Sequence, residues 1–171
     1  AAITDALRLS RGMSYKNAMA GLAMGGGKAV ILSDAKGMKS PEMISAFARA
    51  IDSLGGRYVT AQDVGMSAAD MVAISQGTRY VSGLPPKDGG AGGDPGPTTA
   101  MGVFLGVKAA VRRALGKDDL AGVHIAIQGV GSVGGGVARH AAAVGARITL
   151  ADKNVEYSTA LATEIGAQIV S

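Results

Sequence analysis

The sequence predicts an α/β fold in two parts, and three observations carry this prediction. Short apolar runs of strand length alternate with longer segments whose apolar residues recur at helical spacing, as in α/β proteins. Hydrophobic residues make up 47% of the 171 residues and charged residues 18%, which excludes intrinsic disorder and is enough to build a core. Residues 83–97 are rich in glycine and proline and predict a long irregular connection between the two parts.

The first part is predicted to begin with a helix over residues 2–17, because Ile3, Leu7 and Tyr15 recur near helical spacing among polar and small residues. A loop rich in glycine and methionine follows this helix. The apolar run 29–32 comes next, and its length and composition are typical of a buried strand.

A second helix is predicted from residue 41, because Ser40 is a residue type that caps helix N-termini and the proline after it suits the first helical position. Apolar residues at helical spacing continue this helix as far as the glycine pair 55–56, which ends it. Residues 58–60 suit a second strand. Ser67 opens the sequence Ser-Ala-Ala-Asp, which has the form of a capping box and predicts a third helix.

The second part is predicted to open with a helix that is capped by Thr98 or Thr99 and ended by Gly116. After this helix come a strand, a helix and another strand, over residues 123–128, 133–144 and 147–151. The chain starts at Ala1 inside a helical pattern and ends just after a strand-like run, so we expect an internal fragment of a longer protein.

A glycine motif of the form G-x-G-x-x-G joins the predicted strand to the following helix, at Gly129, Val130, Gly131, Ser132, Val133 and Gly134. Its three glycines allow a tight turn, close approach of the backbone to a pyrophosphate, and close packing of helix on strand. The helix N-terminus offers free N–H groups to phosphates. The motif therefore predicts a dinucleotide-binding turn. The alternative is a glycine-rich turn that binds nothing.

An acidic residue follows at the spacing that this kind of turn requires. Asp152 lies 18 residues beyond Gly134, close to the position of the acid that accepts hydrogen bonds from the ribose hydroxyls. A carboxylate there repels a 2′-phosphate, so NAD is favoured over NADP. The alternative is that Asp152 is a solvated acid at a strand end.

Two lysines and an aspartate give the first part a possible chemistry. Lys16 and Lys28 flank the glycine-rich loop, and repulsion between nearby ammonium groups, with partial burial, favours one neutral amine that can act as a base. Asp63 ends a predicted strand, and the carboxyl ends of parallel strands face the ligand crevice. The alternatives are solvated surface lysines and a turn-capping aspartate.

Several other classes of partner are not expected. The net charge of +4 is spread along the chain without a basic run, so nucleic-acid binding is not expected. The longest uncharged stretch, residues 120–138, contains six glycines and a histidine, which excludes a membrane span. His124 and His140 have no ligand partners at suitable spacing, so no metal site is expected. The absence of cysteine and of a secretory segment favours a cytoplasmic protein.

Four segments together resemble successive motifs of the glutamate/leucine/phenylalanine/valine dehydrogenases. They are MSYKNA at 13–18, GGGKAVI at 25–31, TAQDVG at 60–65 and GDPGPTTA at 93–100. Their order and spacing match that family, and the resemblance runs through essentially the whole chain. The second segment is most similar to the leucine/phenylalanine/valine branch, that is, to leucine dehydrogenase-like enzymes.

The resemblance implies NAD-dependent, reversible oxidative deamination of an L-amino acid to a 2-oxo acid and ammonia, with a branched-chain aliphatic substrate. It implies that Lys16 pairs with the substrate α-carboxylate and that Lys28 is the catalytic lysine, which activates the attacking water. Asp63 is implied to exchange protons with the amino group. Thr99 matches a threonine near the nicotinamide, and Ala61 resembles the leucine-type pattern of the substrate pocket.

The resemblance also implies a domain organisation. Residues 1–95 are expected to be a partial substrate-binding and dimerisation domain, and residues 96–171 a truncated Rossmann domain that binds NAD. We expect a homo-oligomer of the complete protein, and we expect the fragment itself to be inactive. The alternatives are a non-catalytic NAD-binding regulatory module, or a dehydrogenase for phenylalanine, glutamate or another 2-amino or 2-hydroxy acid. One departure is that residues 134–136 carry more glycine than the family usually does.

Overall fold

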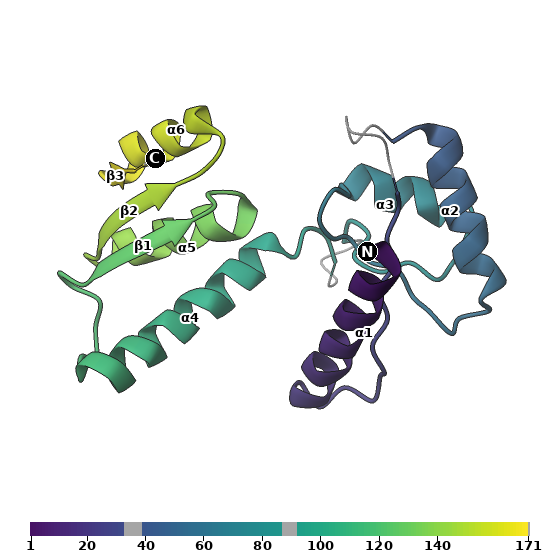
Figure 1. Ribbon diagram of the computed structural model, residues 1–171, viewed down its shortest axis with the longest axis horizontal. Coiled ribbons are helices and arrows are strands. Elements are labelled where there is room, and N and C mark those ends of the chain that lie inside the picture. Colours follow the sequence, from purple (N-terminus) through teal and green to yellow (C-terminus); the bar gives the residue numbers. More distant parts are fainter. Residues whose placement is uncertain (33–38, 87–91, 171) are drawn as a thin grey trace. The chain divides into compact units, whose positions relative to one another are not determined.

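The computed structural model describes residues 1–32, 39–86 and 92–170. The chain divides into two units, Ala1–Asp94 and Pro95–Ser171, each with its own internal packing (Figure 1). Part of the predicted glycine- and proline-rich connection, residues 87–91, lies outside the described residues.

The described residues of the first unit form three helices, α1 (Ala2–Met19), α2 (Pro41–Ser53) and α3 (Ala68–Ser75), and all three were predicted. The caps are confirmed as well. The Ser40 side chain accepts a hydrogen bond from the Met43 N–H at 3.2 Å, and Ser67 forms the capping box with Asp70. The helices α2 and α3 begin where they do because polar side chains satisfy N–H groups that have no partner within the helix.

The two strands predicted in the first unit do not form as strands. Residues 29–32 have no ladder partner among the described residues, and Val30 and Leu32 are 44% and 76% exposed. Of the run 58–60, only Thr60 pairs, in an isolated parallel bridge with Val81. The prediction was wrong because an apolar run becomes a strand only when a neighbouring segment supplies hydrogen bonds, and a local pattern does not encode that neighbour.

The core of the first unit lies between α2 and α3. Ile44 and Ala48 from α2 pack against Met71 and Ile74 from α3, and all four are buried. Partly buried apolar residues pack around them, at Phe47, Met66, Val81 and Leu84. This core supports the segment from Thr60 to Ser67, which connects to the start of α3. By contrast, α1 has no buried residue.

The second unit is a parallel sheet covered by helices on one face. Its elements in order are α4 (Gly96–Leu115), β1 (His124–Gln128), α5 (Ser132–Ala143), β2 (Arg147–Ala151), α6 (Val155–Ile165) and β3 (Gln168–Ile169). The strand order is β1-β2-β3, with α5 and α6 as the parallel crossovers (Figure 1). In the core of this unit, Ile148 and Leu150 of β2 pack with side chains from the helices. These include Phe104 of α4, Ala138 of α5 and Leu161 of α6.

The start of α4 differs from the prediction. The helix begins at Gly96 with Pro95 as its N-cap residue, so Thr98 and Thr99 are not caps. A proline in the first turn loses no hydrogen bond, because N–H groups there have no partner within the helix. The Thr99 hydroxyl instead donates to the Pro95 carbonyl at 2.8 Å. The predicted end is confirmed, since Gly116 adopts a left-handed conformation with φ of 66°.

At the end of the chain, the helix α6 was not assigned from the sequence, whereas β3 falls in the strand-like run expected there. The helix α6 has a capping signal, because the Asn154 side chain accepts from the Tyr157 N–H at 3.2 Å and Gly166 ends it with φ of 67°. The short strand β3 follows and pairs with β2. Within the described ranges, no helix is both long and apolar enough to cross a membrane.

Candidate active site and nucleotide-binding turn

The structure brings Lys28 and Asp63 together. Their side chains form an ion pair, although the two residues come from separate segments of the first unit. The lysine side chain is 23% exposed and the aspartate side chain 49% exposed, so the pair is open to solvent on the aspartate side. Asp63 also accepts a hydrogen bond from the Val64 N–H at 2.8 Å. A proton can therefore pass directly between an amine and a carboxylate that face each other.

The glycine loop before Lys28 is held against α1. Asn17 donates from its side-chain amide to the Gly25 carbonyl at 2.6 Å. A Cβ atom on Gly26 would collide with the backbone of Ser10 and Ser14. Only glycine therefore lets the loop backbone run this close to the helix.

The last glycine of the loop faces an aromatic ring. A Cβ atom on Gly27 would lie 2.5 Å from the ring of Tyr58, so the backbone passes closely over that ring. Because Tyr58 lies on the segment that leads to Asp63, this packing brings the loop and the aspartate segment together. The ion pair of Lys28 with Asp63 is the consequence.

The two predicted substrate-binding residues lie in α1, against which the loop is held, and on the segment that leads to Asp63. Lys16 is exposed in the last turn of α1, next to Asn17. Ala61 is exposed and follows Thr60, whose N–H donates to the Tyr80 carbonyl at 3.0 Å. In the part of the chain that the structure describes, no hydrogen bond or ion pair joins Lys16 or Ala61 to the side chains of Lys28 and Asp63. Their assignment stays a prediction.

The glycine motif in the second unit forms a tight turn between β1 and α5. Gly129 adopts φ of 90°, a conformation that side chains rarely permit. A Cβ atom on Gly134 would collide with the Gly129 carbonyl, so the helix packs directly on the turn. Gly131, in contrast, has nothing within 4 Å of the place where a Cβ atom would stand. The backbone is therefore closely packed on its inner side and open at Gly131.

The extra glycines of this motif have a packing role. A Cβ atom on Gly135 would lie 3.0 Å from the Val130 carbonyl and 3.7 Å from Leu161 of α6. On Gly136 it would lie 2.6 Å from Ala100 of α4. The helix α5 thus uses glycine on the sides that meet its two neighbouring helices.

Asp152 is bonded to the glycine turn itself. Its carboxylate accepts from the Val130 N–H at 2.7 Å and from the Asn154 N–H at 2.7 Å. These backbone hydrogen bonds, chiefly the one from Val130, hold the pKa of Asp152 below its usual value. The carboxylate is therefore charged at neutral pH. Each of its oxygens keeps a second lone pair that can accept from a ligand.

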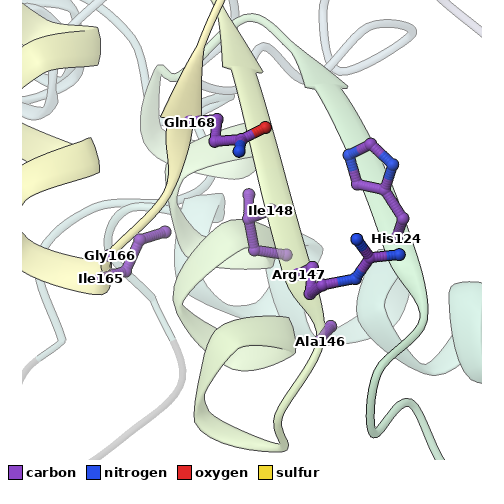
Figure 2. Close-up of a pocket in the computed structure, with 7 residues that line it drawn as sticks. All are labelled: His124, Ala146, Arg147, Ile148, Ile165, Gly166 and Gln168. Atoms are coloured by element: carbon purple, nitrogen blue, oxygen red, sulfur yellow. The ribbon is translucent and has the colours of Figure 1, made fainter.

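The sheet has hollows at both ends. One, of about 350 Å³, is lined in part by Gln128 and Ala151, which are the last residues of β1 and β2 and directly precede the glycine turn and Asp152. The other, of about 270 Å³, lies at the opposite end of the strands, beside their first residues His124 and Arg147 (Figure 2). Only the first hollow adjoins the predicted nucleotide site.

Four residues around these sites were not singled out from the sequence. Asn17 and Tyr58 place the glycine loop, Lys39 contacts the turn after Asp63, and the buried side-chain oxygen of Gln62 has no hydrogen-bond partner among the described residues. Asn17 and Gln62 stand next to Lys16 and Asp63, so proximity to a motif was the available signal. The described residues contain no group of three or more side chains suited to hold a metal ion.

Comparison with known proteins agrees with the motifs. Residues 1–80 match the family model of the Glu/Leu/Phe/Val dehydrogenase dimerisation domain. Leucine dehydrogenase of Geobacillus stearothermophilus is 48% identical over 169 residues, which cover 99% of this chain and 46% of that protein. Valine dehydrogenase of Streptomyces virginiae is 47% identical over 155 residues, which cover 91% of this chain and 43% of that protein. The chain thus spans less than half the length of these relatives.

Solved structures give the same picture. L-tryptophan dehydrogenase from Nostoc punctiforme matches with a TM-score of 0.68 and 39% identity, over 99% of this chain and 47% of that chain. Hetero-hexameric glutamate dehydrogenase from Thermus thermophilus matches with a TM-score of 0.71 and 25% identity, over 96% of this chain and 45% of that chain. In its motifs, its fold and these relatives alike, the chain is similar to the Glu/Leu/Phe/Val dehydrogenases, and residues 1–80 match that family's dimerisation domain.

Proposed function

We propose that the chain is part of an NAD-dependent dehydrogenase that converts an L-amino acid reversibly to its 2-oxo acid and ammonia. The observation that carries this proposal is the ion pair of Lys28 with Asp63 beside the glycine loop. Oxidative deamination needs a group that activates water and a group that moves protons on and off the amino nitrogen, and an adjacent amine and carboxylate can supply both.

Each side chain of the first unit has a separate task in this reaction. The exposed ammonium of Lys16 pairs with the substrate α-carboxylate. Asp63 takes a proton from the substrate ammonium group, so that the neutral amine can be oxidised to the iminium. Lys28, once its own proton has been released to solvent, takes a proton from the water that attacks the iminium carbon. Asp63 returns its proton to the nitrogen of the resulting carbinolamine, and the carboxylate so regenerated takes the hydroxyl proton as ammonia departs and the 2-oxo acid forms. The first unit, which contains these residues, is the substrate-binding domain in this proposal.

The second unit binds NAD in this proposal, as a truncated Rossmann domain. The residues fit the cofactor, because the backbone is open at Gly131 where a pyrophosphate must approach, and α5 begins there without a side-chain cap. Residues Gly129–Gly134 would hold the pyrophosphate, and Asp152 would accept from the ribose hydroxyls. Thr99 would lie near the nicotinamide. The chemistry that bound NAD would supply is acceptance of a hydride from the substrate α-carbon.

The substrate in this proposal is a branched-chain aliphatic amino acid. The leucine and valine dehydrogenases among the relatives support this choice, as does Ala61 in the predicted pocket segment. Phenylalanine, glutamate or another 2-amino acid is the runner-up. A non-catalytic NAD-binding module is disfavoured, because a nucleotide sensor has no use for Lys28 paired with Asp63.

We also propose that the complete protein is a homo-oligomer located in the cytoplasm. The match of residues 1–80 to a dimerisation domain supports assembly. The Thermus thermophilus glutamate dehydrogenase, described as hetero-hexameric, shows that a relative assembles into a larger particle. The cytoplasmic location rests on the absence of cysteine from the sequence.

A substrate panel tests the proposed function. The complete protein is supplied with NAD and either leucine, valine, phenylalanine or glutamate, and NADH formation is followed by absorbance. We expect turnover with leucine and valine to exceed turnover with the other two, because the proposed pocket is aliphatic. NAD binding without turnover on any of the four would instead favour the regulatory module.

A further inference from the structure

The turn that carries Asp63 has a defined local shape. The Asp63 carbonyl accepts from the Met66 N–H at 2.9 Å, and its side chain accepts from the Val64 N–H at 2.8 Å. Gly65 adopts φ of 80°, which favours glycine. These bonds fix the turn internally, but the Asp63 side chain is 49% exposed. Its direction therefore depends on what anchors the turn to the rest of the unit.

Lys39 supplies an anchor from another segment. Its ammonium donates to the Gly65 carbonyl at 2.6 Å and forms an ion pair with Asp70. The two side chains are 25% and 17% exposed, so solvent and salt screen this pair less than a fully exposed one. One ammonium therefore joins the turn after Asp63 to the first turn of α3.

Asp70 is itself fixed by the capping box of α3. Its carboxylate accepts from the Ser67 N–H at 2.7 Å and from the Ser67 hydroxyl at 2.8 Å. Burial raises the pKa of Asp70, but the hydrogen bonds from Lys39 and Ser67 outweigh it and lower the pKa overall. The Asp70 carboxylate, which forms the ion pair with Lys39, is thus charged at neutral pH, and its hydrogen bonds to Ser67 fix its orientation.

Lys39 is also held at its backbone. It directly precedes Ser40, which caps α2, and α2 packs through Ile44 against Met71 of α3. The backbone of Lys39 is thereby fixed to one helix while its side chain reaches the next. This arrangement, Lys39 with Gly65, Ser67 and Asp70, is called the Lys39 clamp.

We propose that Lys39 is a positioning residue for Asp63. By holding the Gly65 carbonyl at the start of α3, the clamp keeps the Asp63 carboxylate beside Lys28. This inference rests on the proposed function, in which Asp63 moves protons on the substrate nitrogen. Among the described residues, Lys39 forms no hydrogen bond or ion pair with Lys28 or Asp63, so its effect on the reaction is exerted through the turn. Its loss should lower turnover and leave NAD binding unchanged.

The test compares three variants of the complete protein with the wild type. Lys39→Met removes the charge and the donors, Lys39→Arg keeps a cation with N–H donors, and Lys117→Met makes the same change at an exposed lysine of the second unit. We measure kcat, the KM values for amino acid and NAD, and hydrogen–deuterium exchange of residues 63–67.

The clamp predicts a specific pattern. Lys39→Met should lower kcat about tenfold, since a misplaced proton-transfer group slows catalysis, and should leave the KM for NAD unchanged. Exchange in residues 63–67 should become faster, because the turn opens more often. Lys39→Arg should restore both readings towards wild type, and Lys117→Met should alter neither. Asp70→Asn, which keeps an acceptor for Ser67, should change both readings in the same direction as Lys39→Met, by a smaller amount.

Three results separate the possible failures. Unchanged exchange in both Lys39→Met and Asp70→Asn would overturn the clamp, whatever the activity. If Lys39→Met showed faster exchange in residues 63–67 but kept the wild-type kcat, the positioning role would be overturned. A wild-type protein that turns over no amino acid would overturn the proposed function and the positioning role with it, while exchange would still decide whether Lys39 holds the turn.

Discussion

The carboxylate of Asp152 accepts hydrogen bonds from two backbone N–H groups in the protein without any ligand. The bond from Val130 ties the end of β2 to the glycine turn, and the bond from Asn154 ties it to the cap of α6. The residue is therefore part of the turn's structure as well as the proposed ribose acceptor. Its removal should affect the shape of the turn and the choice of cofactor together.

We expect Asp152→Ala to weaken NAD binding about tenfold or more, because the variant loses charge-assisted hydrogen bonds from the ribose. Binding of NADP should weaken less, since the repulsion of its 2′-phosphate is also removed. Titration of both cofactors, followed by fluorescence or calorimetry, measures the two affinities. Asp118→Ala, at an acid whose side chain is 82% exposed, is the control. Equal NAD affinity in Asp152→Ala and wild type would reject the ribose role.

Several site residues could be predicted one by one, and their partners could not. Lys28 and Asp63 stood out from motifs, but their ion pair joins separate segments and follows from the packing of Gly27 on Tyr58. Lys39 carried no signal in the sequence, because its role comes from contacts with Gly65 and Asp70. A local sequence pattern identifies a residue by its type. Which residues it contacts depends on the packing of segments that are far apart in the sequence.

Among the elements, the helix α5 depends most on glycine. Gly131 and Gly134 differ sharply in their surroundings, since one has open space where a Cβ atom would stand and the other has the Gly129 carbonyl. Gly131 has φ of −64°, which any residue can adopt. The first position is thus open for a ligand, and the second is required for packing. Replacing each of the two glycines in turn with alanine separates the two roles.

We expect Gly134→Ala to destabilise the protein by about 1–3 kcal/mol, because the added methyl group forces the helix away from the turn. Gly131→Ala should leave the melting temperature within a few degrees of wild type, and it should weaken NAD binding about tenfold through steric exclusion of the pyrophosphate. Thermal unfolding and NAD titration of both variants measure this. If Gly131→Ala bound NAD as wild type does, the pyrophosphate would not lie on this turn.

Element prediction succeeded where the determining interactions are local. The starts of α2 and α3 follow from the side chains of Ser40 and Ser67, and the end of α4 follows from Gly116. The strands β1 and β2 were predicted together with α5, the helix that connects them. In the first unit, the runs 29–32 and 58–60 had strand composition but lack a ladder partner in the described ranges. Pairing is non-local, so composition alone could not decide it.

At the scale of the whole molecule, the proposed chemistry is divided between the two units. Lys28, Asp63 and the Lys39 clamp belong to Ala1–Asp94, and the glycine turn with Asp152 belongs to Pro95–Ser171. This division predicts that substrate chemistry and cofactor binding respond separately to mutation. A change at Lys28 should disable the reaction and spare the nucleotide site.

The central claim is that Lys28 and Asp63 carry out the reaction while the second unit binds the cofactor. It is tested most directly by measuring both NAD affinity and turnover of Lys28→Ala in the complete protein. NAD affinity is measured by titration, and deamination of leucine by NADH formation, with Lys117→Ala as the control. We predict that turnover falls by about 10³-fold or more while NAD affinity stays within about twofold of wild type, since general acid–base groups contribute on this scale. Turnover near the wild-type rate in Lys28→Ala would contradict the assignment of the reaction to the Lys28–Asp63 pair.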